Sequence, residues 1–335
     1  MTDLNGKTLL ITGATGSFGT TFIREALKRW DVEAIRAFSR DELKHGELAL
    51  AIGDARVRHL IGDVRDLERL RLATRGVDLI VHAAALKQVP ACEYNPFEAV
   101  QTNIIGTQNV ISAAIDNRVP LTVALSTDKA VNPANLYGAT KLCAEKIVAQ
   151  AGVYAGNTPA RFASVRYGNV VGSRGSVIPI FKQQAPTGRL TITDERMTRF
   201  WITLEEAVEF VLSCIPLAEG GETFVPKIPS MRVLDVAQAL APDAERVITG
   251  IRPGEKLHEV LLTEDEARHS YDLGDRFVIL PHRHDPPEPR GDGLPDGFRY
   301  SSDTNDRWLS TDDLRAIADR IRPARRRADR VPSSG

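Results

Sequence analysis

The sequence has very few cysteines: Cys92, Cys143 and Cys214 are the only three among its 335 residues. They are scattered, they form no Cys-x-x-Cys motif and one of them must stay unpaired, so they support neither a disulfide framework nor a cysteine-based metal site. Small, buried, hydrophobic side chains in a reducing compartment are the simplest interpretation. We therefore expect a cytoplasmic protein without a metal.

Long hydrophobic runs and an excess of charge of either sign are also missing. No apolar run reaches the ~20 residues that a membrane-spanning helix needs, and Met1 to Lys7 is too polar to begin a signal peptide. The formal net charge of −1 gives no reason to expect a nucleic-acid or membrane partner. What remains is an ordinary globular composition, 42% hydrophobic and 26% charged.

A glycine-rich motif lies close to the start of the chain. The apolar run Lys7 to Thr12 predicts a strand, Gly13-Ala-Thr-Gly-Ser-Phe-Gly19 follows it, and an amphipathic helical pattern continues to about Arg29. This order is typical of a dinucleotide site, because the glycines permit a tight turn and the helix N-terminus faces the pyrophosphate. The residues expected to contact the cofactor here are Gly13, Thr15, Gly16, Ser17, Phe18 and Gly19.

The end of the second predicted strand, Ala34 to Phe38, should determine which dinucleotide binds. Ser39 and Arg40 follow it and Lys44 comes a turn later, which suits a ribose 2'-phosphate and favours NADP over NAD. Two acidic residues directly after Arg40 oppose this choice, and the two cations could equally be solvated charges at a helix start. Further expected cofactor contacts are Asp63 and Val64 after the third strand, and Ala83 and Ala84 after the fourth.

The segment Ser126 to Lys141 carries the strongest candidate catalytic residues. Tyr137 and Lys141 are four residues apart on a predicted helix, so they share one face, and a nearby lysine cation favours the tyrosine phenolate as a general base. Thr127, before them, offers a hydroxyl to the phenol or to a substrate oxygen. This set resembles the active site of the short-chain dehydrogenase/reductase superfamily, where Tyr137 and Lys141 would also contact the cofactor.

Asp128 and Lys129 add a carboxyl group and an amine directly after the threonine. A simple alcohol dehydrogenase needs no such acid and base, whereas a dehydratase does. In isolation, an Asp-Lys pair after a strand is more often a solvated loop or a helix cap. The order of apolar strand, Ser-Thr, Asp-Lys, Asn/Pro loop and helical tyrosine favours the catalytic interpretation here.

The predicted elements alternate between strand and helix as far as about Lys146, which indicates an α/β fold with a Rossmann-like, doubly wound parallel sheet. We expect an NADP-binding domain over residues 1–170, to which the chain returns near 203–226. Residues 171–321 should mainly form a smaller, mixed α/β substrate-binding lobe, and the arginine-rich residues 322–335 a disordered tail. A ligand would lie between the lobes, at the carboxyl ends of the strands.

Seven motifs that follow one another along the chain carry a more specific resemblance. They are Gly13-A-T-G-S-F-Gly19, His82-A-A-A-L-K-Q-V-Pro90, Ser126-T-D-Lys129, Leu136-Y-G-A-T-Lys141, Arg166-Y-G-N-V-V-G-S-R-G-Ser176, Met197-T-R-Phe200 and Arg252-P-G-E-K-L-His258. Together they closely resemble the inverting UDP-N-acetylglucosamine 4,6-dehydratases, from about Gly6 to Ile321. The discriminating piece is Asp128-Lys129, because related retaining dehydratases typically carry Asp-Glu there and simple 4-epimerases lack an acid/base pair.

This resemblance implies inversion at C5 of UDP-N-acetylglucosamine, giving UDP-2-acetamido-2,6-dideoxy-β-L-arabino-hexos-4-ulose, with a tightly bound NADP that is regenerated in each turnover and with a homo-oligomer. Tyr137, assisted by Lys141, would remove the 4-OH proton. Lys129 would take the C5 proton, which requires a neutral amine and a lowered pKa, and a protonated Asp128 would protonate the departing 6-OH. The sequence leaves the division of roles between Asp128 and Lys129 open.

Contacts to the UDP-sugar also follow from the matched motifs. The implied residues are Lys87, Asn169, Arg174, Arg199, Arg252 and Glu255, with Thr127 beside the sugar. The alternatives are a UDP-sugar 4-epimerase, a dehydratase for another N-acetylhexosamine, and a non-enzymatic protein that senses NADP. Such a sensor would usually have lost the tyrosine or the lysine, and both are present.

Overall fold

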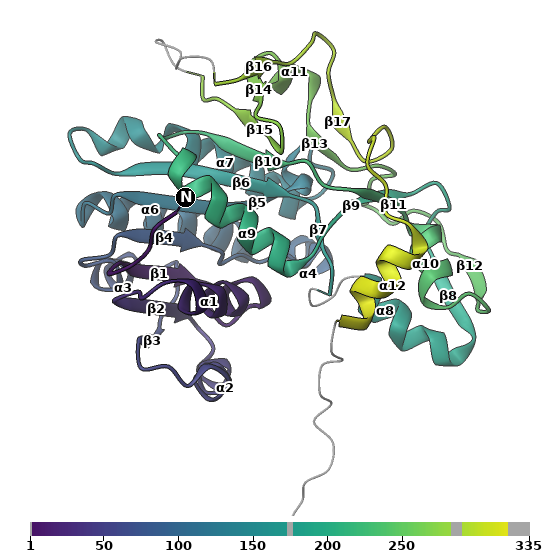
Figure 1. Ribbon diagram of the computed structural model, residues 1–335, viewed down its shortest axis with the longest axis horizontal. Coiled ribbons are helices and arrows are strands. Elements are labelled where there is room, and N and C mark those ends of the chain that lie inside the picture. Colours follow the sequence, from purple (N-terminus) through teal and green to yellow (C-terminus); the bar gives the residue numbers. More distant parts are fainter. Residues whose placement is uncertain (1, 173–176, 283–289, 321–335) are drawn as a thin grey trace, which may run out of the picture.

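The computed structural model describes residues 2–172, 177–282 and 290–320. A twisted ten-stranded sheet runs through the larger part of the described molecule (Figure 1). From one edge to the other its strands are β16 (Asp292–Gly293), β14 (Ser270–Asp272), β15 (Arg276–Ile279), β10 (Thr223–Pro226), β6 (Arg161–Tyr167), β5 (Leu121–Thr127), β4 (Leu79–His82), β1 (Thr8–Thr12), β2 (Ala34–Ser39) and β3 (Val57–Ile61). The predicted tail, 322–335, lies outside the described residues.

The strands from β10 to β3 are all parallel, and β15, β14 and β16 continue the sheet in antiparallel pairs. The central strands are short apolar runs, and β5 is buried along its whole length, as expected of parallel strands covered on both faces. This confirms the predicted α/β fold with a Rossmann-like sheet. The chain does return to this sheet after residue 203, because β10 pairs with β6.

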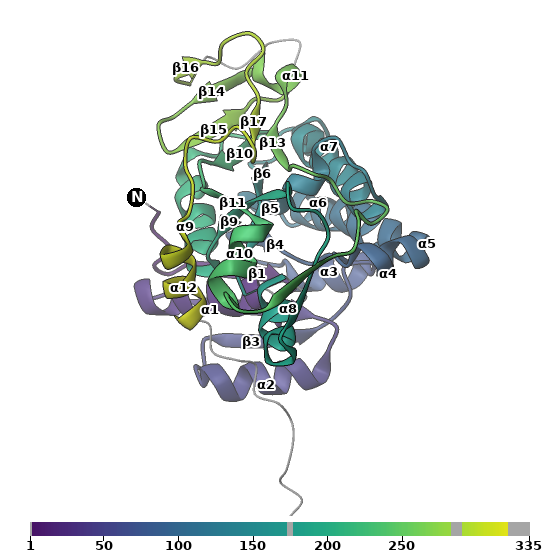
Figure 2. The ribbon, with the colours of Figure 1, turned by 90° about the vertical axis from the view of Figure 1, so that its right-hand side faces the viewer.

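Helices cover both faces of the sheet, as Figure 2 shows edge-on. On one face lie α1 (Ser17–Arg29) and α9 (Leu204–Cys214), and on the other α3 (Leu67–Ala73), α6 (Gly106–Asp116) and α7 (Leu136–Ala155). The remaining helices before β5 are α2 (Glu42–Ile52), α4 (Val89–Tyr94), α5 (Pro96–Val100) and the π-helical turn η1 (Gln101–Ile105). Cys143, expected to be buried, is exposed on α7, whereas the other two cysteines are buried.

A smaller lobe forms beside the carboxyl ends of the parallel strands. Its strands are β11 (Ser230–Arg232), β9 (Thr198–Ile202) and β7 (Asn169–Val170) in one sheet, β12 (Glu245–Ile248) with β8 (Arg189–Ile192), and β13 (Val260–Leu262) with β17 (Tyr300–Ser301). Its helices are α8 (Val177–Gln184), α10 (Val233–Leu240) and α12 (Thr311–Arg320), and α11 (Glu264–Ala267) follows β13. Among the described residues, no helix combines the length and the apolarity that crossing a bilayer requires.

A buried ion network ties the sheet to its surroundings. The Arg166 guanidinium on β6 donates to both carboxylate oxygens of Glu145 on α7 (3.0 and 2.7 Å) and of Glu266 on α11 (3.0 and 2.8 Å). It also donates to the Leu261 carbonyl oxygen. Bidentate pairing on both sides gives the buried Glu145 and the partly buried Glu266 a shared, hydrogen-bonded counter-ion.

Removing the cation from this network should destabilise the fold. In Arg166→Met two carboxylates would remain without their counter-ion, so we expect the free energy of unfolding to fall by about 3–5 kcal/mol. Chemical denaturation with urea measures this, and Arg24→Met, at an exposed position of α1, is the matched control. A loss below about 1 kcal/mol would show that the network does not hold the elements together.

Candidate active site

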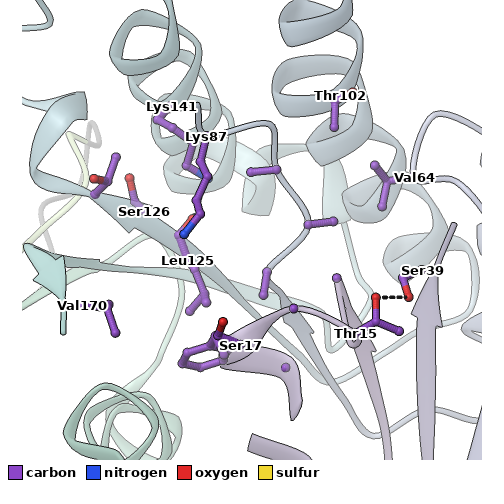
Figure 3. A pocket seen from close by; sticks show the side chains of 18 of the residues that line it. Thr15, Ser17, Ser39, Val64, Lys87, Thr102, Leu125, Ser126, Lys141 and Val170 are labelled. Carbon is purple, nitrogen blue, oxygen red and sulfur yellow. Dashed lines mark hydrogen bonds between the residues drawn. The ribbon is translucent and has the colours of Figure 1, made fainter. Parts of the chain in front are cut away.

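A cleft of about 550 Å³ opens at the carboxyl ends of β1, β2, β4, β5 and β6. Figure 3 shows part of its lining, with side chains from these separate strand ends turned towards one cavity. All fifteen residues expected to contact the cofactor line it, from Gly13 to Lys141. Lys87, Thr127, Lys129 and Asn169 line it too, whereas Asp128 is fully buried behind the surface of the cleft.

The glycine motif forms a turn that larger residues could not. Gly13 has φ +67°, and a Cβ there would lie 2.9 Å from the Ala83–Ala84 backbone, so this glycine lets the loop after β1 approach the loop after β4. A Cβ on Gly19 would lie 2.6 Å from Ala14 Cα, so α1 can begin directly against the turn. The result is a cradle in front of a helix N-terminus, which suits a dinucleotide pyrophosphate.

Two side chains of the cleft have unused hydrogen-bonding capacity. Thr102 Oγ1 and Ser126 Oγ are buried and make no hydrogen bond within the described residues. Buried hydroxyls without a partner are unfavourable, so both are suited to a polar ligand. The cradle, these two hydroxyls and the residues after β4 therefore fit a nicotinamide dinucleotide lying across the strand ends.

At the end of β2 the cleft is polar and cationic. Ser39 Oγ lies 3.1 Å from Thr15 Oγ1, the contact dashed in Figure 3, and 2.9 Å from His45 Nε2. Arg40 is half exposed and its guanidinium lies 3.7 Å from the Asp63 carboxylate. The buried His45 was missed from the sequence, because nothing in its local pattern shows that its ring turns back to Ser39.

Lys44, the other cation of this end, pairs with Asp41 at 2.5 Å across the first turn of α2. The two expected cations thus both have acidic neighbours, and both still line the cleft. A phosphate entering here would compete with these carboxylates for the same donors.

The candidate catalytic residues begin where β5 passes into a 3-10 turn, η2 (Asp128–Ala130). Thr127 Oγ1 donates to Asp128 Oδ1 at 2.8 Å and accepts from the Lys129 amide. Lys129 Nζ lies 2.9 Å from the Asp128 carboxylate and donates to Asn169 Oδ1 at 2.7 Å. A carboxyl group and an amine are therefore in direct contact at the strand end.

Tyr137 reaches this pair because α7 starts very close to η2. Asn135 caps the helix by accepting from the Gly138 amide, and a Cβ on Gly138 would lie 2.2 Å from the Lys129 carbonyl oxygen. Only glycine permits this approach. Burial raises the pKa of Tyr137, and a hydrogen bond with Thr127 offsets this only in part.

Lys141, one turn further along α7, is buried. Its Nζ donates to the Leu125 carbonyl oxygen at 2.6 Å, and burial lowers its pKa to about 8. Lys141 is therefore within reach of deprotonation near neutral pH, unlike an ordinary lysine.

The expected ionisation of Lys129 is wrong for the free protein. Burial alone would lower the pKa of Lys129, but the carboxylates of Asp128 and Glu259 outweigh burial and raise it. Lys129 is therefore an ammonium at neutral pH. Asp128 is adjacent in sequence, whereas Glu259, the second of these carboxylates, is far away and could not be found from the segment around Lys129.

The remaining substrate residues expected from the sequence are dispersed. Arg199 does not line the cleft, and its guanidinium donates to the carbonyl oxygens of Thr198, Lys256 and Leu257. Arg252 is exposed and lies 3.8 Å from the Glu255 carboxylate. Arg174 lies outside the described residues.

Comparison with known proteins gives consistent similarities over most of the chain. The family described as polysaccharide biosynthesis protein matches residues 9–281. An inverting UDP-N-acetylglucosamine 4,6-dehydratase of Campylobacter jejuni is 49% identical over 322 residues, which are 92% of this chain and 96% of that protein. A UDP-glucose 4-epimerase of Rickettsia rickettsii is 42% identical over 281 residues, 82% of each chain. The crystal structure of Pen from Bacillus thuringiensis is 37% identical, with a TM-score of 0.86, and covers 94% of this chain and 99% of its own.

The lowered pKa of Lys141 makes stability depend on pH. Unfolded Lys141 binds its proton up to about pH 10.5 and folded Lys141 only up to about 8, so stability should rise with pH between these values. The slope due to this one group is at most about 1.4 kcal/mol per pH unit. Urea denaturation of the wild type and of Lys141→Met from pH 7.5 to 10 measures the difference. Parallel pH dependences of the two proteins would contradict this assignment.

Proposed function

The chain belongs to the polysaccharide biosynthesis protein family, and on this premise we propose that it converts UDP-N-acetylglucosamine by 4,6-dehydration with inversion at C5. The product is a UDP-linked 6-deoxy-4-keto sugar of the L-arabino series. The observation that carries this proposal is the contact between Asp128 and Lys129 beside Tyr137, since elimination of water needs an acid and a base at adjacent carbons. The dehydratase of Campylobacter jejuni, at 49% identity, supports the same reaction.

The cofactor of this proposal is NADP, which when bound would supply hydride chemistry, oxidation at C4 of the sugar and reduction at C6. Arg40 and Lys44 at the end of β2 would hold the ribose 2'-phosphate. Thr102 and Ser126 would complete their hydrogen bonding on the same ligand. The turn from Gly13 to Gly19 would hold the pyrophosphate with its backbone amides.

Tyr137 is the group proposed to take the proton of the sugar 4-OH. Its pKa is raised in the free protein, so it has to be activated when the site is filled. A nearby positive charge favours the phenolate, and Lys141 lies one helical turn away with its Nζ anchored on the Leu125 carbonyl oxygen. Thr127, hydrogen-bonded to the phenol, would orient it towards the sugar.

Asp128 and Lys129 provide the elimination. In the free protein they form an ammonium–carboxylate pair, and one proton transfer across their 2.9 Å contact converts it into a neutral amine and a carboxylic acid. These are the two forms that the elimination needs, so reaching them takes no proton from solvent. The Lys129 amine then takes the C5 proton, and the electron pair of the C5–H bond forms an enolate with the C4 carbonyl. The enolate expels the 6-OH, which leaves as water with the Asp128 proton while the C5–C6 double bond forms.

The UDP-sugar would lie along the same cleft towards the smaller lobe. Lys87 and Asn169 line the cleft beside the catalytic residues and are proposed to contact the sugar or its phosphates. Arg252, which is exposed, and Glu255, which is partly buried, do not line the cleft and would reach the UDP from outside its lining. Arg199 would attract the UDP-sugar through its charge, because its two NH₂ groups already donate to backbone carbonyls.

The direct test is proton NMR of the purified protein with UDP-N-acetylglucosamine in heavy water. We expect a new 6-deoxy methyl signal, deuterium at C5 and coupling constants of the L-arabino configuration. Lys129→Met should make no such product and should not exchange the C5 proton, because the amine that accepts it is missing. Accumulation of a C4 epimer without a methyl signal would instead establish a UDP-sugar 4-epimerase, the activity of the Rickettsia rickettsii relative.

The choice of NADP is tested at Arg40. Arg40→Ala should weaken NADP binding by about 10- to 100-fold, the value of one or two charge-assisted hydrogen bonds, and should leave NAD binding nearly unchanged. Fluorescence titration of the reduced cofactors measures both affinities. Arg58→Ala, at an exposed position of β3, is the matched control. Equal losses for the two cofactors would exclude a 2'-phosphate at Arg40.

A further inference from the structure

Glu259 is a buried carboxylate whose surroundings are unusual. It directly precedes β13 and is only 4% exposed. Three cations surround it: Oε1 lies 3.6 Å from Lys129 Nζ and 3.7 Å from Arg199 Nε, and Oε2 lies 4.0 Å from Lys256 Nζ. All three distances exceed a hydrogen bond, and Oε2 has no hydrogen-bond partner in the part of the chain that the structure describes.

A buried carboxylate that served only to stabilise the fold would be expected to have hydrogen-bond partners. Burying a charge without hydrogen bonds is strongly unfavourable, and attraction to several cations offsets this only in part. The same chain builds a fully bonded buried network around Arg166, with contacts of 2.7–3.0 Å. Among the buried carboxylates of the residues that the structure describes, Glu259 is therefore the exception, and it lies 3.6 Å from the amine of the candidate base.

The backbone of Glu259 is fixed by hydrogen bonds, although its carboxylate Oε2 has none. Its amide donates to Ser302 Oγ, and the Ser302 amide donates to the Glu259 carbonyl oxygen. The start of β13 is thus fixed against the end of β17, and the carboxylate lies 3.6–4.0 Å from three cations. Of these only Lys129 lines the cleft.

We propose that Glu259 is a positioning residue of the dehydration, which shares the Lys129 ammonium with Asp128 and stabilises that ammonium when the C5 proton arrives. This inference rests on the proposed function. At the start of the elimination Lys129 has passed its proton to Asp128, and its amine takes the C5 proton as the C5–H bond breaks. At that moment Asp128 gives its own proton to the 6-OH, so the charge on Lys129 reappears between two carboxylates.

The charged groups that face Lys129 decide how strong this effect is. Asp128 and Glu259 stabilise the ammonium, while Arg199 and Lys256 oppose it from β9 and from the loop before β13. Without the Glu259 charge the cluster would hold three cations and one carboxylate. Once Lys129 has passed its proton to Asp128, loss of the Glu259 charge lowers the basicity of the Lys129 amine by about 1–3 pH units. The amine is then a weaker base towards C5, which would make C5 deprotonation the slow step.

The test is Glu259→Gln, which keeps the shape and removes the charge. We expect kcat for UDP-N-acetylglucosamine to fall at least about tenfold, in line with that change in basicity, with KM changed little. Substrates deuterated at C5 or at C4 locate the slow step. In Glu259→Gln the isotope effect on kcat/KM should be larger for deuterium at C5 than for deuterium at C4.

Two further variants separate positioning from folding. Glu259→Asp restores the charge with a shorter reach and should recover part of the lost turnover. Glu222→Gln removes another buried carboxylate, one that contacts Arg290 and the Gly220 amide, and should lower the melting temperature while leaving the ratio of the two isotope effects as in the wild type.

Several outcomes would overturn the proposal. They are an unchanged kcat in Glu259→Gln, a larger isotope effect at C4 than at C5 in that variant, and a loss of turnover that Glu259→Asp does not reduce. These results differ from a failure of the proposed function, which would show in the wild type as the absence of a 6-deoxy product.

Discussion

The Lys129 ammonium is held between two buried carboxylates, and much of the molecule is arranged to keep it there. Asp128 comes from the same turn at the end of β5, whereas Glu259 comes from the start of β13. Asn169, at the start of β7, accepts a third contact from the amine. Because even a partly buried charge has to be compensated, the ammonium is most stable when these three segments meet. The charge state of the candidate base therefore depends on how the smaller lobe docks against the sheet.

The sheet and the glycine turn could be predicted because their causes are local. Short apolar runs such as Lys7 to Thr12 and Arg161 to Tyr167 have few alternatives to a buried strand, and Gly13 to Gly19 follows a strand directly. The candidate catalytic residues were accessible for a related reason. They lie in one stretch of 15 residues, so the sequence alone indicated that they are neighbours: Thr127, Asp128, Lys129, Tyr137 and Lys141.

What could not be predicted depends on contacts between segments that are distant in sequence. The pKa of Lys129 was expected to be lowered, but the carboxylates of Asp128 and of the distant Glu259 together raise it. Arg199 was expected to hold the substrate, yet backbone carbonyls of β9 and of the segment before β13 take up its donors. His45 contacts Ser39 only because α2 folds back over the end of β2. In each case the sequence identifies the side chain, and the fold determines which groups that side chain contacts.

The return of the chain to the sheet has a consequence for how this protein can be divided. The cofactor-binding part resembles a separate domain, yet β10 is the neighbour of β6 and α9 packs on α1 (Figure 1). A fragment ending near residue 170 would leave β6 as an open edge, with a row of unpaired amides and carbonyls, and would expose the apolar side of α1 to solvent. Such edges recruit other strands, and the fragment would aggregate instead of folding. The cofactor-binding part and the rest of this protein therefore fold as a single unit. Neither could be exchanged between proteins by a simple fusion at that boundary.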